Sequence, residues 1–304
     1  MIGRIASRTT AMNSLANLQA SQVRSDRIQQ QMTSGKAYVK LSDDPVAAND
    51  ALRFRSEIAV NEQYGRNISD GQRWLSVQEG SLGSVTNSLH AARDALVQAN
   101  NAAVSNPAAR GALAAQLRSI RDDLLAQANT QHEGHPVFGG TTTAGTAVAA
   151  TFSGTTGTYT ITGDEGAVTR RVAPGHDVRV NATATEVFGG AGGAPTVFQQ
   201  LDALADAVES GDTTAVGAGL ATIDAARDRV LSVRGALGAR VNQLEALEQA
   251  NAVRGDALTG SLDEVEGVDI AKAMIEFRLQ DTAYQAALAT TAKVIQPTLL
   301  DFLR

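Results

Sequence analysis

The sequence predicts a mainly α protein: a long antiparallel helical rod, or coiled-coil bundle, built from both chain ends, with a small inserted antiparallel β domain. Three observations predict this fold. Apolar residues recur every seven positions in two long segments, the middle of the chain changes to a Gly- and Thr-rich pattern of period two, and aromatic residues make up only 4% of 304 residues. Small and aliphatic apolar residues line the narrow seams between helices more easily than they fill one thick core.

The first long seam starts at Ala47 and the second at Val216, and both continue in steps of seven. One asparagine interrupts each seam, Asn61 in the first and Asn251 in the second, and a lone polar residue of this kind can set the register of two helices. A Ser-Asp-Gly run that ends at Gly71 is a candidate break in the first helix, because glycine costs about 1 kcal/mol relative to alanine there. The residues expected in the rod seam are Phe54, Ile68, Leu75, Leu82, Leu89 and Leu96, together with Ile223, Val230, Leu237 and Leu244.

A third helix is expected from about Pro107 to Asn129, with Asn106 as its N-cap and the proline in its first turn. Beyond it, residues 131–195 alternate at period two and are interrupted by glycines. Two of these short runs, 158–162 and 168–172, flank Gly-Asp-Glu-Gly, which is typical of a hairpin. We therefore expect a small β module between two helical arms.

These patterns divide the chain into five segments. We expect an N-terminal assembly helix with its connector at residues 1–44, the N-terminal part of the rod at 45–130, the inserted β domain at 131–195, the C-terminal part of the rod at 196–258, and a C-terminal assembly helix at 259–304.

Both chain ends carry helical apolar stripes that are too narrow to be stable alone, because isolated helices take most of their stability from packing. The N-terminal stripe consists of Met12, Leu15, Leu18, Val23, Ile28 and Met32. The C-terminal stripe consists of Ile270, Met274, Phe277, Tyr284, Leu288, Ile295 and Phe302. Pro297 is expected to kink or end this last helix. Packing within one chain and packing between copies both fit the two stripes.

A polar connector joins the N-terminal helix to the rod. Its expected members are Ser34, Gly35, Ser42, Asp43, Asp44 and Pro45. Gly35 suits the position after a helix, where a positive φ is needed. Ser42 or one of the two aspartates can cap the next helix, with the proline in its first turn. The alternative, a metal site on the two aspartates, lacks convergent ligands.

The chain offers little for catalysis or cofactor binding. The His132–His135 run, His-Glu-Gly-His, places its second histidine at i+3 instead of the i+4 of helical zinc sites, so a polar exit from a helix is favoured. The Gly-rich run 189–195 lacks the Lys-Ser/Thr of a phosphate loop and is expected to be a linker. There are no cysteines, and Trp74 is expected to be a packing residue. We therefore predict no enzyme activity, no cofactor and no metal.

Charge and hydropathy exclude two further classes of protein. The net charge is −6 and the basic residues are scattered, so the footprint of a nucleic-acid-binding protein is absent. No run of 18 apolar residues predicts membrane insertion. The N-terminal stretch lacks the apolar core and cleavage site of a secretory signal.

Two terminal stretches carry a family resemblance. QQMTSGKAYVKLSDDPVAANDALRF resembles the N-terminal signature of the flagellin superfamily, and VDIAKAMIEFRLQDTAYQAALATTAKVIQPTLLDFLR resembles its terminal helix. The exit from the helical region, Val-Phe-Gly-Gly-Thr at residues 137–141, resembles the aromatic-Gly-Gly-Thr step of the hook–filament junction family, whereas flagellins usually have a Phe-Asn-Gly step there. The resemblance covers roughly residues 1–140 and 195–304 and leaves the β insert out.

The resemblance implies a structural subunit of the bacterial flagellum, an adaptor that joins the hook-associated layer to the flagellin filament by ordering and packing of its terminal helices. It also implies an extracellular location, reached through the flagellar type III export channel without a cleavable signal peptide. The implied partners are flagellin, the first hook-associated protein, sister copies in a ring-like layer, and an export chaperone on the C-terminal helix. Two alternatives stay open: a short flagellin, and a secreted adhesive or binding protein whose β module recognises a ligand.

Overall fold

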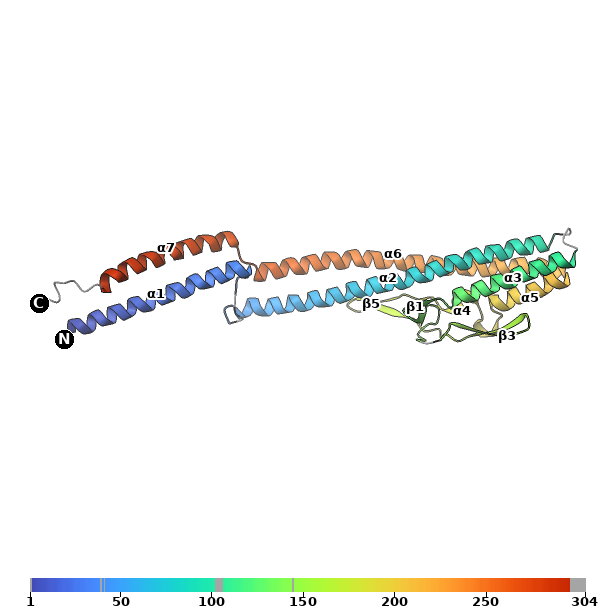
Figure 1. The fold of residues 1–304 in the computed structure, drawn as a ribbon, viewed down its shortest axis with the longest axis horizontal. Coiled ribbons are helices and arrows are strands. Elements are labelled where there is room, and N and C mark those ends of the chain that lie inside the picture. Colours follow the sequence, from blue (N-terminus) through green and yellow to red (C-terminus); the bar gives the residue numbers. More distant parts are fainter. Residues whose placement is uncertain (1, 39, 41, 102–105, 144, 296–304) are drawn as a thin grey trace. The chain divides into compact units, whose positions relative to one another are not determined.

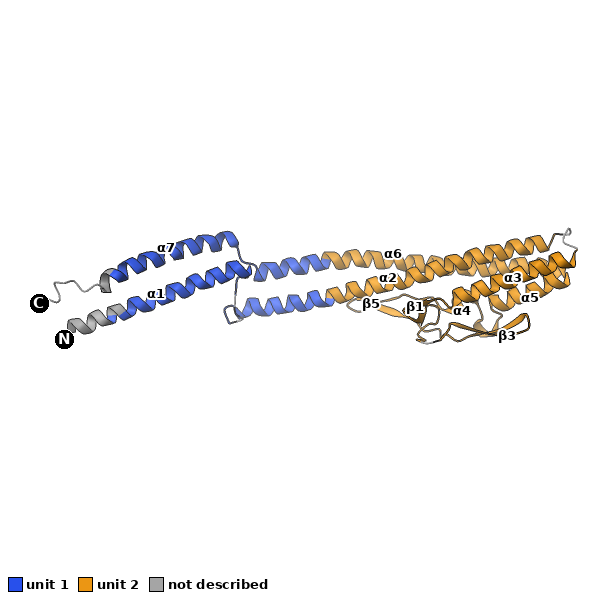
Figure 2. Cartoon of the chain, viewed as in Figure 1, with its two compact units in different colours: residues 1–60, 254–304 blue, residues 61–253 orange. Residues whose placement is uncertain are grey.

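The computed structural model describes residues 2–38, 40, 42–101, 106–143 and 145–295, with the side chain of Thr9 and those from Met12 to Ala292 within those ranges. Their contacts form two compact units, one of residues 1–60 and 254–304 and the other of residues 61–253 (Figure 2). Each unit contains segments from both halves of the sequence. The five segments proposed from the sequence subdivide the chain by pattern, and that subdivision stays a prediction.

Long helices dominate the described residues (Figure 1). They are α1 (Ile2–Ser34), α2 (Pro45–Ala99), α3 (Pro107–Ala128), α5 (Val197–Ser210), α6 (Thr213–Glu266) and α7 (Ile270–Ile295), with the short α4 (Ala184–Phe188) and a 3-10 turn, η1 (Ala191–Gly193). The predicted cap of α3 is confirmed, because Asn106 accepts a hydrogen bond of 2.9 Å from the Ala108 amide, and Pro107 begins the helix.

The candidate break at Gly71 is absent, because α2 continues through it from Pro45 to Ala99. A Cβ at Gly71 would lie 3.0 Å from Cγ1 of Val180 and 3.2 Å from Cδ1 of Leu244. The glycine therefore allows two other segments of the same unit to approach the helix closely, and packing across it stabilises the helical conformation that glycine alone disfavours.

Between α3 and α5 the chain forms three two-stranded antiparallel sheets. They pair β1 (Gln131–His132) with β2 (His135–Pro136), β3 (Val148–Ser153) with β4 (Thr156–Ile161), and β5 (Thr169–Ala173) with β6 (His176–Arg179). The mainly α fold class with small antiparallel sheets in the middle of the chain is thus confirmed.

The predicted hairpin across Gly-Asp-Glu-Gly is wrong, because the strands on its two sides pair with other partners: β4 with β3, and β5 with β6. The tight turns lie instead at Gly154 and Gly175, both with φ +69°. The Asp164 carboxylate in the predicted turn accepts hydrogen bonds from the amides of Thr141 and Gly166. It therefore ties this loop to the exit from α3 and does not close a hairpin.

The core of the second unit contains most of the predicted seam. Nine of the predicted seam residues have at most 1% exposure: Ile68, Leu75, Leu82, Leu89, Leu96, Ile223, Val230, Leu237 and Leu244. Phe54 belongs to the first unit and is half-buried. Beside the seam, Phe188 packs against Phe138 and Phe198 with ring centroids 5.6 and 5.2 Å apart. These rings attach the β-rich segment to the helices.

Two buried polar side chains fasten the β-rich segment. Gln78 on α2 is fully buried; it donates to the carbonyls of Val137 and Ala182 and accepts from the Ala182 amide at 3.0 Å. Asp202 on α5 is also buried; it pairs with Arg121 on α3 and accepts from the Tyr159 hydroxyl at 2.8 Å. Since buried polar groups need partners, each residue specifies where the strands dock.

Candidate assembly surface

Helices α1 and α7 lie side by side in the first unit (Figure 1). The residues that their contact buries are small or polar: Ser21, Ala273 and Thr291 are 7%, 5% and 9% exposed. Near its middle, Nε2 of Gln280 donates to the carbonyl and the hydroxyl of Ser21 at 3.1 and 2.6 Å. The most buried positions of this contact are therefore small or hydrogen-bonded, and large side chains beside them are half-buried.

The two predicted stripes divide into covered and uncovered parts. Leu18, Ile28 and Met32 on α1 are half-buried, as are Phe277 and Tyr284 on α7. The stripe residues that stay exposed are Met12, Leu15, Val23, Ile270, Met274 and Leu288, at 44–66%. Ile295 lies in α7 but outside the described side chains, and Phe302 and Pro297 lie outside the described residues.

Two large apolar residues that the sequence stripe missed are the most exposed on α7: Ile275 at 70% and Leu279 at 71%. They lie one turn apart and therefore share a face. On α7 this face is well removed from the side of Ala273 and Gln280, which contacts α1. The helix pair therefore presents apolar groups to solvent in more than one direction.

The connector after α1 shows how the helix is stopped and the next one started. Gly35 has φ +70°, and its amide donates to the Gln31 carbonyl at 2.9 Å. Of the three candidate caps, Asp44 accepts from the amides of Val46 and Ala47 at 3.1 and 3.0 Å. Pro45 then begins α2.

The other connector residues have lesser roles. Asp43 accepts from the Lys40 amide at 3.0 Å and lies 3.5 Å from Arg27 of α1. Ser34 Oγ accepts from the Lys36 amide at 3.3 Å, and Ser42 is exposed. The carboxylates at 43 and 44 are thus used in local turns and caps.

Sequence reasoning missed the buried carboxylate at this joint. Glu266, the last residue of α6, is 8% exposed, and its carboxylate lies 2.5 Å from Arg55, 3.0 Å from the Tyr38 hydroxyl and 3.4 Å from Lys36. Burial acts to raise the pKa of Glu266, but the hydrogen bonds from Tyr38 and Arg55 and the charges of Arg55 and Lys36 outweigh it, so the pKa is lowered. The only sequence signal for this residue was the loss of the heptad pattern where α6 ends.

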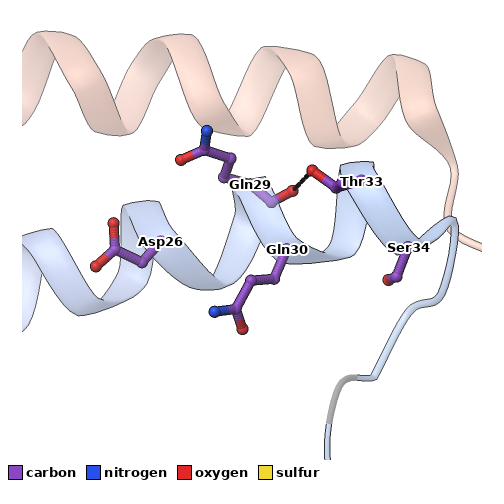
Figure 3. Close-up of a pocket in the computed structure, with 5 residues that line it drawn as sticks. All are labelled: Asp26, Gln29, Gln30, Thr33 and Ser34. Carbon is purple, nitrogen blue, oxygen red and sulfur yellow. Dashed lines mark hydrogen bonds between the residues drawn. The ribbon is translucent and has the colours of Figure 1, made fainter.

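The last two turns of α1 border an open hollow of about 520 Å³ lined by polar side chains (Figure 3). They are Asp26, Gln29, Gln30, Thr33 and Ser34. The hydroxyl of Thr33 donates to the Gln29 carbonyl at 2.7 Å. Among the described residues that line it, the hollow has one carboxylate and several amide and hydroxyl groups, so it offers hydrogen bonds to a neighbour.

The two asparagines that interrupt the long seams lie at the same level. Nδ2 of Asn61 donates to the Asn251 carbonyl at 3.0 Å, and Asn61 is 7% exposed. A Cβ at Gly65 would come within 3.2 Å of the Asn251 amide nitrogen, so this glycine leaves room for the pair. The hydrogen bond between them can form only when α2 and α6 are aligned with these two residues at the same level.

The two runs considered as metal or phosphate sites, 132–135 and 189–195, form turns and packing contacts. His132 and His135 belong to the β1–β2 hairpin; the first packs edge-on against Trp74 at 5.7 Å, and the second contacts the Thr143 carbonyl at 2.8 Å. Gly189 ends α4 and is followed by the η1 turn. Within the described residues, no group of three or more His, Asp or Glu side chains could hold a metal ion, and no helix there is long and apolar enough to cross a membrane.

Comparison with known families agrees with this arrangement at both ends of the chain. Residues 5–143 match the bacterial flagellin N-terminal helical region, and residues 220–303 match the bacterial flagellin C-terminal helical region. The chain belongs to the flagellin superfamily. This membership explains why the helices of the first unit come from opposite ends of the sequence.

Two curated members of the superfamily match over nearly the whole length. Flagellar hook-associated protein 3 of Salmonella typhimurium is 26% identical over 94% of this chain and 95% of its own. Flagellin of Bacillus subtilis is also 26% identical, over 96% of each chain.

Solved structures show the same fold. A putative flagellar hook-associated protein from Vibrio parahaemolyticus has a TM-score of 0.67 and 29% identity, covering 74% of this chain and 100% of its own. The flagellar junction protein FlgL from Legionella pneumophila has a TM-score of 0.57 at 21% identity, covering 72% and 100%.

The predicted resemblance to flagellar hook-associated protein 3 is confirmed by these comparisons, and so is a structural role in the flagellum. The similar relatives are structural flagellar components, which indicates that this chain also interacts with other components of the flagellum.

Proposed function

We propose that this chain is the hook–filament junction subunit of a bacterial flagellum, and that its α1–α7 pair completes its packing only against neighbouring subunits. One observation carries the mechanism. Among the described residues, the pair buries only the small or polar Ser21, Ala273 and Thr291, and it leaves eight large apolar side chains exposed: Met12, Leu15, Val23, Ile270, Met274, Ile275, Leu279 and Leu288. Single exposed apolar residues are ordinary, but a set gathered on two adjoining helices is typical of an interaction surface.

The free energy gained by burying these side chains is large enough to drive assembly. Full burial of one such side chain contributes about 1.5–3 kcal/mol, so burial of several is comparable with the stability of a whole domain, about 5–15 kcal/mol. That gain opposes the conformational entropy lost when long terminal helices become ordered. Ordering of the ends would therefore be coupled to the arrival of neighbours.

The proposed neighbours are sister copies in a ring-like layer, flagellin on one side and the first hook-associated protein on the other. An export chaperone would cover the apolar faces of α7 before assembly. The location would be extracellular, reached by export without a cleavable signal peptide. The exposed α7 side chains support the chaperone proposal, since an uncovered apolar helix promotes premature association.

The test is to replace Leu279 and Leu288 with Asp together. The variant should keep its helical content and the thermal unfolding of residues 61–253, because both side chains are exposed in the lone molecule. It should not be incorporated, so cells should carry hooks without filaments in electron micrographs. The matched control is Thr282→Asp, which adds one charge at an exposed polar position of the same helix. Normal motility of the double variant would contradict the proposal.

A short filament flagellin is the second candidate, because the Bacillus subtilis flagellin has the same identity, 26%, as the hook-associated relative and also covers nearly the whole chain. The two functions differ in self-assembly and in abundance. A junction subunit should not polymerise alone into long filaments and should be a scarce component of isolated flagella. Purified protein that forms long filaments would favour the flagellin alternative.

A further inference from the structure

We propose that Glu266 sets the register of the terminal helix pair. Its main chain and its carboxylate join the connector after α1 to the end of α6. We call this junction the clasp; it consists of residues 35–38, Arg55 and residues 266–268. The clasp fixes how far α7 is shifted along α1. The importance of the clasp for assembly rests on the function proposed above, but the register itself is a property of the single molecule.

The main chain forms the first part of the clasp. The Ala37 amide donates to the Glu266 carbonyl at 2.7 Å, and the Val268 amide donates to the Gly35 carbonyl at 3.1 Å. These two bonds make an antiparallel bridge between Lys36 and Gly267. A Cβ at Gly267 would lie 2.3 Å from the Asp263 carbonyl oxygen, so only glycine allows the chain to turn here.

The carboxylate forms the second part. Glu266 accepts from Tyr38 on one connector and lies in ion-pair range of Lys36 on that connector and of Arg55 on α2. Its side chain is largely buried, whereas those of Arg55 and Lys36 are each 45% exposed. One buried acceptor therefore gathers donors from two segments that are far away in the sequence. Charge-assisted hydrogen bonds of this kind are shorter and stronger than neutral ones.

The helix pair needs such a register device because its own contact specifies register weakly. The most buried residues Ser21, Ala273 and Thr291 are small or polar. The large side chains Phe277 and Tyr284 are only half-buried, and they are two aromatic residues one heptad apart, so a heptad shift of α7 would replace one ring by the other. The hydrogen bonds of Gln280 to Ser21 lie about four helical turns from the clasp along both helices. Equal spacing from a common junction is what brings these two side chains together.

The absence of native cysteines allows the register to be measured directly. One purified variant carries Ser21→Cys and Gln280→Cys, which are in register, and a second carries Ser21→Cys and Ala287→Cys, which are one heptad out of register. A short bis-maleimide cross-linker is added to each at low protein concentration. In the shifted variant Gln280 is also replaced by alanine, because it would otherwise still donate to the main-chain carbonyl of residue 21. Neither variant then keeps a hydrogen bond between these two positions, so the bond does not contribute to the register that is measured.

With Glu266 present, we expect the in-register pair to cross-link in at least about tenfold preference to the shifted pair, since several hydrogen bonds to a charged group favour one arrangement. Glu266→Gln should reduce this ratio severalfold, while the main-chain bridge, which the substitution leaves in place, keeps part of the preference. The matched control is Glu264→Gln, an exposed glutamate two residues away, which should leave the ratio unchanged.

Circular dichroism shows whether Glu266→Gln keeps its helices. If it does not, Arg55→Gln tests the same clasp with Glu266 intact, and it should lower the ratio by a smaller factor. Equal cross-linking of the two pairs in the parent, or an unchanged ratio in both clasp variants, would overturn the inference. A Glu266→Gln protein with a reduced cross-linking ratio that still builds normal flagella would count against the proposed function. The inference about the register would remain supported in that case.

Discussion

At the scale of single residues, buried polar side chains specify the arrangement of this protein more than its apolar residues do. Gln78, Asp202 and Glu266 are all buried, and each joins segments that are distant in the sequence. The apolar seams could slide by a heptad and still bury similar area, whereas a buried carboxylate or amide has partners in one arrangement only.

The ionisation of Glu266 makes the clasp sensitive to pH. Its pKa in the folded protein is lower than the ordinary value of 4.5. A lowered pKa contributes stability that is present above the unfolded pKa and is lost as the pH falls through the folded pKa. At neutral pH, Glu266→Gln should lower the free energy of unfolding by about 1 kcal/mol, since Arg55 and Lys36 are partly exposed and screened by solvent.

Thermal unfolding of the parent and of Glu266→Gln at a series of pH values checks this prediction. The difference between the two proteins should shrink below about pH 4.5 and vanish at lower pH, while Glu264→Gln follows the parent throughout. A difference that stays constant across this range would show that the charge of Glu266 does not stabilise the fold.

At the scale of elements, two glycines of α2 illustrate how the same residue can have opposite effects. An added Cβ at Gly71 would lie 3.0 Å from Val180 and 3.2 Å from Leu244, so both side chains would have to move by a few tenths of an ångström, whereas an added Cβ at Gly80 would meet no atom within 4 Å. Helix propensity predicts that alanine stabilises at both positions by about 1 kcal/mol. Close packing should reverse the sign at Gly71 only.

We therefore expect Gly80→Ala to raise the free energy of unfolding by about 0.5–1 kcal/mol. Gly71→Ala should lower it by about 1–3 kcal/mol, the usual effect of overpacking. Chemical denaturation followed by circular dichroism measures both. Stabilisation by the two substitutions alike would mean that the close approach at Gly71 contributes nothing to stability.

At the scale of the whole molecule, the chain consists of one unit with a conventional apolar core and one with little core of its own. The second unit, residues 61–253, contains the fully buried seam and the aromatic cluster. In the first unit, the residues of the terminal helix pair that are buried are small or polar: Ser21, Ala273 and Thr291. Local stability follows the density of buried apolar contacts.

Hydrogen exchange of the purified monomer should therefore be uneven. Amides of α1 and α7 should exchange much faster than those of α2 and α6 within residues 61–253, and they should become protected in assembled flagella. The amides of Ala37 and Val268, which form the clasp, should be slower than the helices on either side of them. Strong protection of both terminal helices in the lone monomer would contradict the proposed coupling of order to assembly.

The sequence by itself determined the helices, the seams and the family. Heptad spacing predicted Ile68 to Leu96 and Ile223 to Leu244 as interior positions, because a helical period is a local property of the chain. It also predicted that asparagines interrupt both seams, although not that Asn61 and Asn251 meet. The flagellin resemblance followed from short motifs at the two ends.

Only the tertiary structure decided which strands pair, which face of α7 is covered, and which carboxylate joins the connector after α1 to the end of α6. Strand pairing depends on turns and on anchors such as Asp164, which a local pattern cannot rank. The end of the heptad pattern was the only sequence signal near Glu266, because its partners Lys36, Tyr38 and Arg55 lie more than two hundred residues away. The local period of apolar residues predicts which face each helix buries, whereas contacts between distant segments form only once the chain has folded.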